Sequence, residues 1–177
     1  TLVLNAFPNE PEKLTLPVYL SIGLHPWHIQ SDTWEKQVET AESAMGAANI
    51  LAVGESGLDK TIKVPYDLQI RAFEAQQHIA QTHRKPMIIH CVRSYNELLA
   101  LRKKSDLTLP WIFHWFNADV RIALELIRKN CYLSFGHMLF NENSRAFRAF
   151  REIPPGHIFF ETDDAGYSIK EVYEKAS

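Results

Sequence analysis

The sequence has 177 residues, of which 46% are hydrophobic and 23% charged, so its composition is that of a globular domain rather than a disordered chain. Its formal net charge of -2 provides no general attraction for nucleic acid, so metal ions and local donors would have to hold such a substrate. Two cysteines, Cys91 and Cys131, are too few for a disulfide framework, and no apolar stretch is long enough to span a membrane. We therefore expect a cytoplasmic protein without a membrane partner.

Short apolar runs that end at glycine, proline or a polar residue predict strands, and they alternate with segments that have a helical pattern. We predict seven strands, which begin near Leu2, Val18, Ile50, Met87, Trp111, Tyr132 and Ile158. Helices are predicted over residues 32–45, 65–83, 94–101, 120–127 and 143–151 and after Ser168. This alternation of strand and helix is typical of an α/β fold with a parallel sheet.

Polar residues precede several of the predicted helices at the spacing of a capping box, in which Glu follows the N-cap residue by three positions. The pairs are Asp32 with Glu35, Ser94 with Glu97, and Ser168 with Glu171. Asp119 is predicted to cap the helix over residues 120–127 by itself.

The number of strands is one short of a (β/α)8 TIM-type barrel, which needs eight and rarely has fewer than about 200 residues. The first residue is Thr1 rather than Met. We therefore expect residues 1–177 to form a single hydrolase barrel domain that is incomplete at its N-terminus, with the first strand missing.

Four of the predicted strands are followed directly by residues that bind metal ions in proteins. The strand from Ile50 closes at Gly54 and is followed by Glu55, and the last strand is followed by Glu161, Thr162 and Asp163. His90 and His114 follow two of the strands between them. Because the carboxyl ends of barrel strands lie on the same face, this repetition predicts one open metal site.

Five motifs in this order resemble those of the TatD family of metal-dependent deoxyribonucleases. They are GLHP from Gly23, GESGLDK from Gly54, IIHCVR from Ile88, IFHWF from Ile112 and FFETDD from Phe159. The resemblance extends from Val18 to the terminal helix and is closest to the shorter bacterial branch of the family. It implies an amidohydrolase-like barrel that cleaves DNA phosphodiester bonds with metal-activated water.

The resemblance also implies a role for each matching residue. Glu55 would bridge two metal ions, His90 and His114 would complete the site of one ion, and Asp163 would bind the other ion and activate water. Glu55 and Asp163 are thus the expected catalytic residues. The expected cofactors are one or two divalent ions (Mg, Mn or Zn), the expected substrate is DNA, and no obligate protein partner is indicated.

His25 and Arg93 are the residues that the resemblance places near the substrate phosphate. The family motif H-x-R is one residue longer here, from His90 to Arg93. The family motif H-x-H of the first strand has no counterpart in the sequence, which coincides with the missing strand. The last motif has Ala165 where proline is usual in the family.

Two other functions remain open at this point. The same barrel also suits hydrolysis of a small phosphoester, ester or amide, because one fold hosts many substrates. A binding protein with a vestigial site is the other alternative, since half of the metal centre is absent with H-x-H. Glu55, His90 and His114 would still form a three-ligand set for a single ion.

Overall fold

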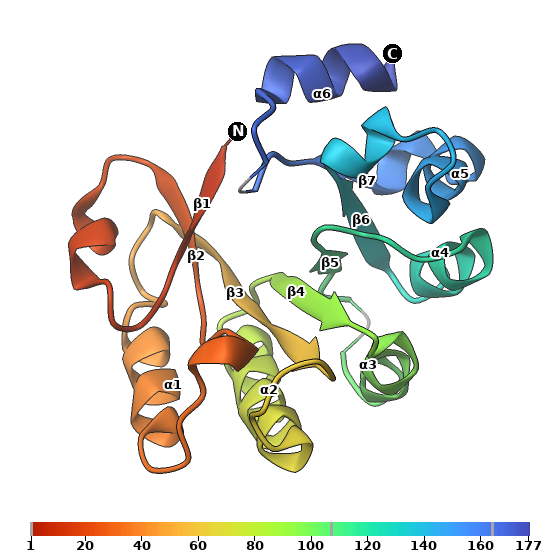
Figure 1. Cartoon of the computed structure of the whole chain (residues 1–177). Helices are drawn as coiled ribbons and strands as arrows, with labels where there is room; N and C mark the ends of the chain where they lie inside the picture. The colour runs from red at the N-terminus through yellow and green to blue at the C-terminus, as the bar shows by residue number, and fades with distance from the viewer. Residues whose placement is uncertain (1, 107, 164) are drawn as a thin grey trace. The chain divides into compact units, whose positions relative to one another are not determined.

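The computed structural model describes residues 2–106, 108–163 and 165–177, which contain seven strands and six α-helices (Figure 1). They form two compact units, Thr1–Trp111 and Ile112–Ser177. Each predicted strand is present and begins within one residue of its predicted position. The α/β fold with parallel strands is therefore confirmed. The described residues show no eighth strand, so the complete barrel and the single domain stay predictions.

The first unit is built on parallel strands in chain order. They are β1 (Val3–Ala6), β2 (Tyr19–Ile22), β3 (Ile50–Asp59) and β4 (Met87–Val92), and each pairs with the next. The N–H of Met87 donates to the carbonyl of Pro110, so the start of β5 (Trp111–Phe113) lies beside β4.

Helices cover this parallel sheet and supply much of its core. Figure 1 shows α1 (Trp34–Ser43) and α2 (Tyr66–Thr82) side by side along the strands, with α2 packed against β3. Helix α2 buries Leu68, Ala72 and Ile79, which lie on one face of the helix. The unit also contains η1 (Pro11–Thr15), η2 (Pro26–His28) and α3 (Tyr95–Arg102).

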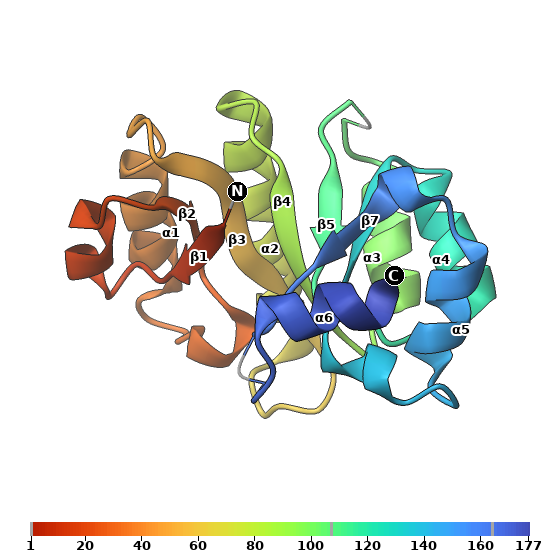
Figure 2. The same cartoon turned by 90° about the horizontal axis from the view of Figure 1, so that it is seen from above.

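In the second unit β6 (Cys131–Phe135) pairs in parallel with β7 (Ile158–Phe160). Helices α4 (Val120–Ile127) and α5 (Arg145–Glu152) lie side by side, as Figure 2 shows, and α4 packs against β6. The unit is completed by η3 (His137–Phe140), η4 (Pro155–His157) and α6 (Ile169–Ala176). In the part of the chain that the structure describes, each helix is too short or too polar to cross a bilayer.

Two of the predicted helix caps are confirmed. The Ser168 hydroxyl accepts from the N–H of Glu171, while the Glu171 carboxylate accepts from the N–H of Ser168, which completes the capping box of α6. The Asp119 carboxylate accepts from the N–H of Ile122 at 3.0 Å and caps α4. These bonds satisfy N–H groups that the first helical turn leaves without partners.

The other two predicted capping boxes are wrong. Ser94 is the N-cap of α3, but its hydroxyl donates to the backbone carbonyl two residues earlier. Glu97 pairs with Lys60 instead of reaching back to the N-cap. Helix α1 takes Thr33 rather than Asp32 as its N-cap. In α3, side-chain contacts outside the first turn therefore replace the capping box that the local sequence pattern predicted.

Strand β3 is longer than the sequence predicted, because it continues through Gly54 to Asp59. Its register against β4 shifts between Val53 and Ser56, where β3 has one residue more than its partner, as in a β-bulge. Gly54 has a φ of 142°, a backbone conformation that L side chains rarely adopt. Glu55 thus lies in a bulge inside the strand and not beyond its end. The prediction that His90 follows its strand is also wrong, because β4 continues past His90 to Val92.

Gly57 allows β3 and β4 to approach each other closely beside a predicted metal ligand. Gly57 pairs with His90, and a Cβ atom at Gly57 would lie 1.9 Å from the His90 carbonyl oxygen. That oxygen belongs to the backbone, so a larger residue at position 57 would have to displace β4 itself.

We expect the substitution Gly57→Ala to lower the free energy of unfolding by about 1–3 kcal/mol, the usual cost of overpacking. Gly46→Ala is the matched control, because no described atom lies within 4 Å of a Cβ placed there. Its effect should stay within about 0.5 kcal/mol. Urea denaturation of both variants measures the difference, and equal stability of the two would contradict the close approach of β3 and β4.

Candidate metal centre

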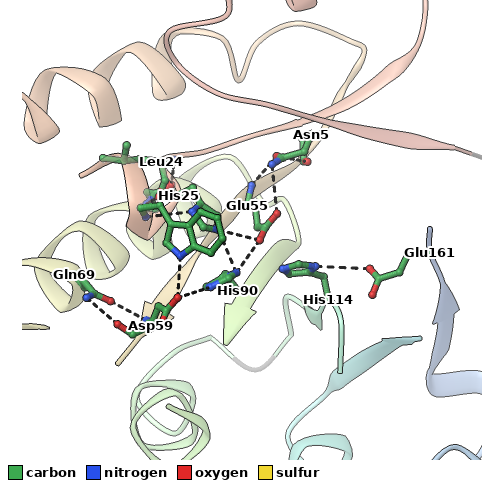
Figure 3. A network of polar contacts seen from close by, with 12 residues as sticks. Asn5, Leu24, His25, Glu55, Asp59, Gln69, His90, His114 and Glu161 are labelled. Atoms are coloured by element: carbon green, nitrogen blue, oxygen red, sulfur yellow. Dashed lines mark hydrogen bonds and ion pairs between the residues drawn. The ribbon is translucent and has the colours of Figure 1, made fainter. Parts of the chain in front are cut away.

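Three predicted site residues of the first unit converge on one point (Figure 3). His90 Nδ1 lies 3.0 Å from Glu55 Oε1, and His25 Nε2 lies 3.2 Å from the same oxygen. The two ring nitrogens are 3.1 Å apart. Both histidines are buried, and Glu55 is partly exposed. One carboxylate oxygen and two imidazole nitrogens therefore form a nearly equilateral triangle at the edge of the solvent.

The size and the chemistry of this triangle suit a divalent ion. Ligand atoms about 2.0–2.1 Å from a tetrahedral Zn²⁺ lie about 3.3 Å from one another, and an octahedral site brings neighbouring ligands slightly closer. The observed edges of 3.0–3.2 Å are close to that spacing. Imidazole and carboxylate are also common ligands of Zn²⁺ and Mn²⁺, so the donor set fits the expected cofactor without selecting one metal.

His25 faces the centre with Nε2, whereas His90 faces it with Nδ1. Its Nδ1 accepts from the backbone N–H of Trp27 at 3.2 Å, so the neutral ring holds its proton on Nε2. Burial lowers the pKa of His25, although the nearby Glu55 opposes this effect, and the ring is therefore neutral at neutral pH. In this state His25 presents an N–H donor to the centre, whereas ligation through Nε2 would require the proton to move.

His90 is held from behind by a second carboxylate. Its Nε2 lies 3.4 Å from Asp59 Oδ2, which leaves Nδ1 directed at Glu55. Asp59 also accepts from the indole N–H of Trp27 at 2.8 Å and from the N–H of Thr61 at 2.7 Å. Burial alone would raise the pKa of Asp59, but the bonds from Thr61 and Trp27 outweigh it and the pKa is lowered. An ionised carboxylate behind an imidazole fixes the orientation of a metal-binding histidine.

Asn5, on β1, holds the backbone of Glu55 in place. Its side-chain oxygen accepts from the Glu55 N–H at 2.8 Å and from the Ser21 hydroxyl at 3.1 Å. Its amide nitrogen lies 3.5 Å from Glu55 Oε2. The bulge in β3 leaves this N–H without a regular ladder partner, and the Asn5 side chain supplies one.

Two buried glutamines of α2 bind the segments that carry His25 and Asp59. Gln76 accepts from the N–H of Leu24 at 2.7 Å and donates to the Leu24 carbonyl at 3.1 Å. Gln69 makes the same pair of bonds with the backbone of Asp59, at 2.8 and 3.0 Å. Both glutamines are 1% exposed and lie seven residues apart on the same face of α2. The helix thus positions both segments through satisfied buried amides.

The second unit carries another histidine and carboxylate pair. His114, directly after β5, has its Nδ1 3.8 Å from Glu161 Oε2, as Figure 3 shows. Burial raises the pKa of Glu161, although His114 and the N–H of Trp115 oppose this shift. Asp163 is exposed and has a φ of 44°.

Of the six predicted site residues, the structure brings His25, Glu55 and His90 together. His114 and Asp163 lie in the second unit, and their roles stay predictions. Arg93 is exposed beyond the end of β4 with a φ of 54°, and its role also stays a prediction.

Several residues around the centre were not predicted to take part. Asp59 had a signal in the sequence, because it belongs to the GESGLDK segment that contains Glu55. Asn5 had none, since it is 50 residues from its partner. The only signal for Gln69 and Gln76 was their position on the buried face of a helix, where a polar side chain is uncommon.

Carboxylate and imidazole donors that converge on a partly open point are typical of metal-dependent hydrolases. The chain matches the family of TatD related DNases over residues 10–171, and it belongs to that family. This match confirms the resemblance found in the motifs.

Two curated relatives are similar to this chain in sequence. The uncharacterized metal-dependent hydrolase YabD of Bacillus subtilis is 29% identical over 149 residues, which cover 82% of this chain and 58% of that protein. The 3'-5' ssDNA/RNA exonuclease TatD of Citrobacter koseri is 30% identical over 149 residues, covering 80% of this chain and 55% of that protein. This chain thus spans a little over half the length of these curated relatives.

A solved structure extends the likeness in fold to nearly the whole chain. The TatD homologue YJJV of Escherichia coli has a TM-score of 0.89 and 21% sequence identity, covering 98% of this chain and 76% of that one. At this identity the comparison bears on the fold alone.

We expect Asp59→Asn to lower the free energy of unfolding by about 1–3 kcal/mol at pH 7, because the amide satisfies fewer of the surrounding donors. The folded pKa of Asp59 is lowered from 3.8, so the stability contributed by its ionisation is fully present above that value. It is lost as the pH falls through the lower folded pKa. The difference from the wild type should therefore shrink in acid.

Denaturant titrations from pH 3 to pH 7 measure this effect. Asp32→Asn makes the same chemical change at an exposed position of the first unit and should alter stability little. A loss of stability in Asp59→Asn that is independent of pH would show that the charge of Asp59 is unimportant.

Proposed function

We propose that this chain is the catalytic part of a metal-dependent nuclease that hydrolyses phosphodiester bonds in single-stranded DNA or at strand ends. The observation that carries this proposal is the triangle of His25 Nε2, Glu55 Oε1 and His90 Nδ1 in a member of the TatD related DNases. The name of the Citrobacter relative, a 3'-5' ssDNA/RNA exonuclease, supports this substrate class. RNA is therefore included in the tests below.

Glu55 and His90 would hold the ion, since both offer a lone pair to the same point. When bound, a divalent ion lowers the pKa of water and withdraws charge from a phosphoryl oxygen. The neutral His25 ring, which has its proton on Nε2, would donate a hydrogen bond to a phosphate oxygen beside it. The carboxylates of Glu55 and Asp59 would repel a bare phosphate, so binding of the anionic substrate would depend on the cation.

The remaining roles rest on the family resemblance and not on placement. We propose that His114 and Asp163 also act as metal ligands, that Asp163 together with Glu55 assists proton removal from water, and that Arg93 contacts the substrate. Residues 1–177 would then work as one hydrolase domain.

We expect Glu55→Gln to reduce cleavage of single-stranded DNA in Mn²⁺ or Mg²⁺ by about 100-fold or more. Loss of a residue that only orients a metal ligand already lowers metal affinity or activity about 10–100-fold, and loss of a direct ligand should lower it at least as much. Glu39→Gln, the same substitution on the exposed side of α1, should leave the rate unchanged. Circular dichroism checks that both variants fold.

The rate assay should use labelled DNA, labelled RNA and a panel of small phosphoesters, esters and amides. Cleavage confined to the small substrates would replace the nuclease with a metal-dependent hydrolase of a small phosphoester, ester or amide. Cleavage of DNA that Glu55→Gln does not affect would remove Glu55 from the mechanism.

Metal binding should also be visible in stability. At a concentration of about 100 times its dissociation constant, an ion that binds only the folded protein adds about 2.7 kcal/mol to the free energy of unfolding. We expect Mn²⁺ or Zn²⁺ to raise the Tm of the chelator-treated wild type and of His78→Ala, an exposed position on α2. His90→Ala should show little of this rise in Tm. An equal rise in His78→Ala and His90→Ala would mean that the ion binds outside the candidate centre.

A further inference from the structure

Trp27 combines high exposure with a fixed orientation. It is 60% exposed, although an indole usually packs its large apolar surface inside the protein. Its N–H nevertheless donates at 2.8 Å to Asp59, a residue that is 1% exposed. The ring therefore presents apolar surface to the solvent while its polar edge is held by a buried carboxylate.

The backbone around Trp27 restricts the ring further. Trp27 belongs to the short helix η2, with the buried Pro26 before it. Its N–H donates to His25 Nδ1, and the N–H of His28 donates to the His25 carbonyl at 2.9 Å. Side chain and main chain of Trp27 thus both bind groups that belong to the candidate metal centre.

The indole also lies directly beside the centre. Its ring centroid is 5.1 Å from that of His25, with the planes nearly perpendicular, and 6.0 Å from that of His90. A planar group stacked on the exposed part of Trp27 would therefore lie next to a phosphate bound at the candidate metal centre.

We propose that Trp27 is a substrate-binding residue on which a nucleobase of the substrate stacks while the adjoining phosphate is at the metal centre. This inference rests on the proposed nuclease function and extends it. Stacking on an aromatic side chain accepts any base, because every base has a π-face. Trp27 would thus favour base-bearing strands over abasic or aliphatic phosphoesters without selecting a sequence.

A structural role for Trp27 predicts a different pattern of variants. If Trp27 only holds Asp59, then Trp27→Phe and Trp27→Ala should weaken oligonucleotide binding equally, because both substitutions remove the indole N–H. If the ring face binds a base, Trp27→Phe should retain most of the binding affinity for a base-bearing strand, since phenylalanine keeps an aromatic face.

The test measures binding of two fluorescent probes by anisotropy in the presence of Mn²⁺. One probe is a short single-stranded oligothymidylate with phosphorothioate linkages that resist cleavage, and the other has the same backbone with abasic units. We expect Trp27→Ala to weaken binding of the base-bearing probe about tenfold and of the abasic probe less than about twofold. Trp27→Phe should stay within about threefold of the wild type for both.

Tyr19→Ala serves as the matched control, because Tyr19 is an exposed aromatic residue of the first unit outside the centre. It should bind both probes like the wild type. Equal weakening of both probes in Trp27→Ala, or no weakening, would overturn the role of Trp27 even if the wild type cleaves DNA normally. A wild type that neither binds nor cleaves oligonucleotides would overturn the nuclease proposal and the stacking role together.

Discussion

The close approach of β3 and β4 at Gly57 and His90 is the constraint on which the candidate centre depends. Without a side chain at Gly57, the two strands come near enough for a Glu55 oxygen to lie 3.0 Å from His90 Nδ1. The bulge at Gly54 supplies the extra residue that places Glu55 within this strand. Two glycines of one motif thus act through the backbone, one by its φ and the other by its missing Cβ.

Buried polar side chains then fix what the glycines bring together. Asn5 binds the N–H of Glu55, Gln76 binds the backbone before His25, and Gln69 binds the backbone of Asp59. Each of these amides has partners for the groups that it buries, so the network avoids the cost of unsatisfied polar atoms. Because these contacts come from β1 and α2, the geometry of the centre is determined by the packing of the whole first unit.

The proposed function requires a protein with a net charge of -2 to act on an anionic polymer, and the local charges support that proposal. The carboxylates of Glu55 and Asp59 would attract a divalent cation, and the bound cation would attract a phosphate. The aromatic surface of Trp27 adds a contact that does not depend on charge. Recognition would thus combine one ion and one ring, and a basic surface would not be required.

The sequence by itself determined the seven strands, the α/β class, the family, and His114 as a residue directly after a strand, because apolar period and short motifs are local properties. It also predicted the caps at Ser168 and Asp119, where the bonded partners are three residues apart. It failed at Ser94, where Glu97 pairs with Lys60 from a distant segment. Only the tertiary structure decided that β3 continues through Glu55, that His25 joins the centre, and that Asn5, Asp59 and Trp27 surround it. Those contacts join residues 31 to 65 positions apart, and such pairing depends on register and packing that no local pattern encodes.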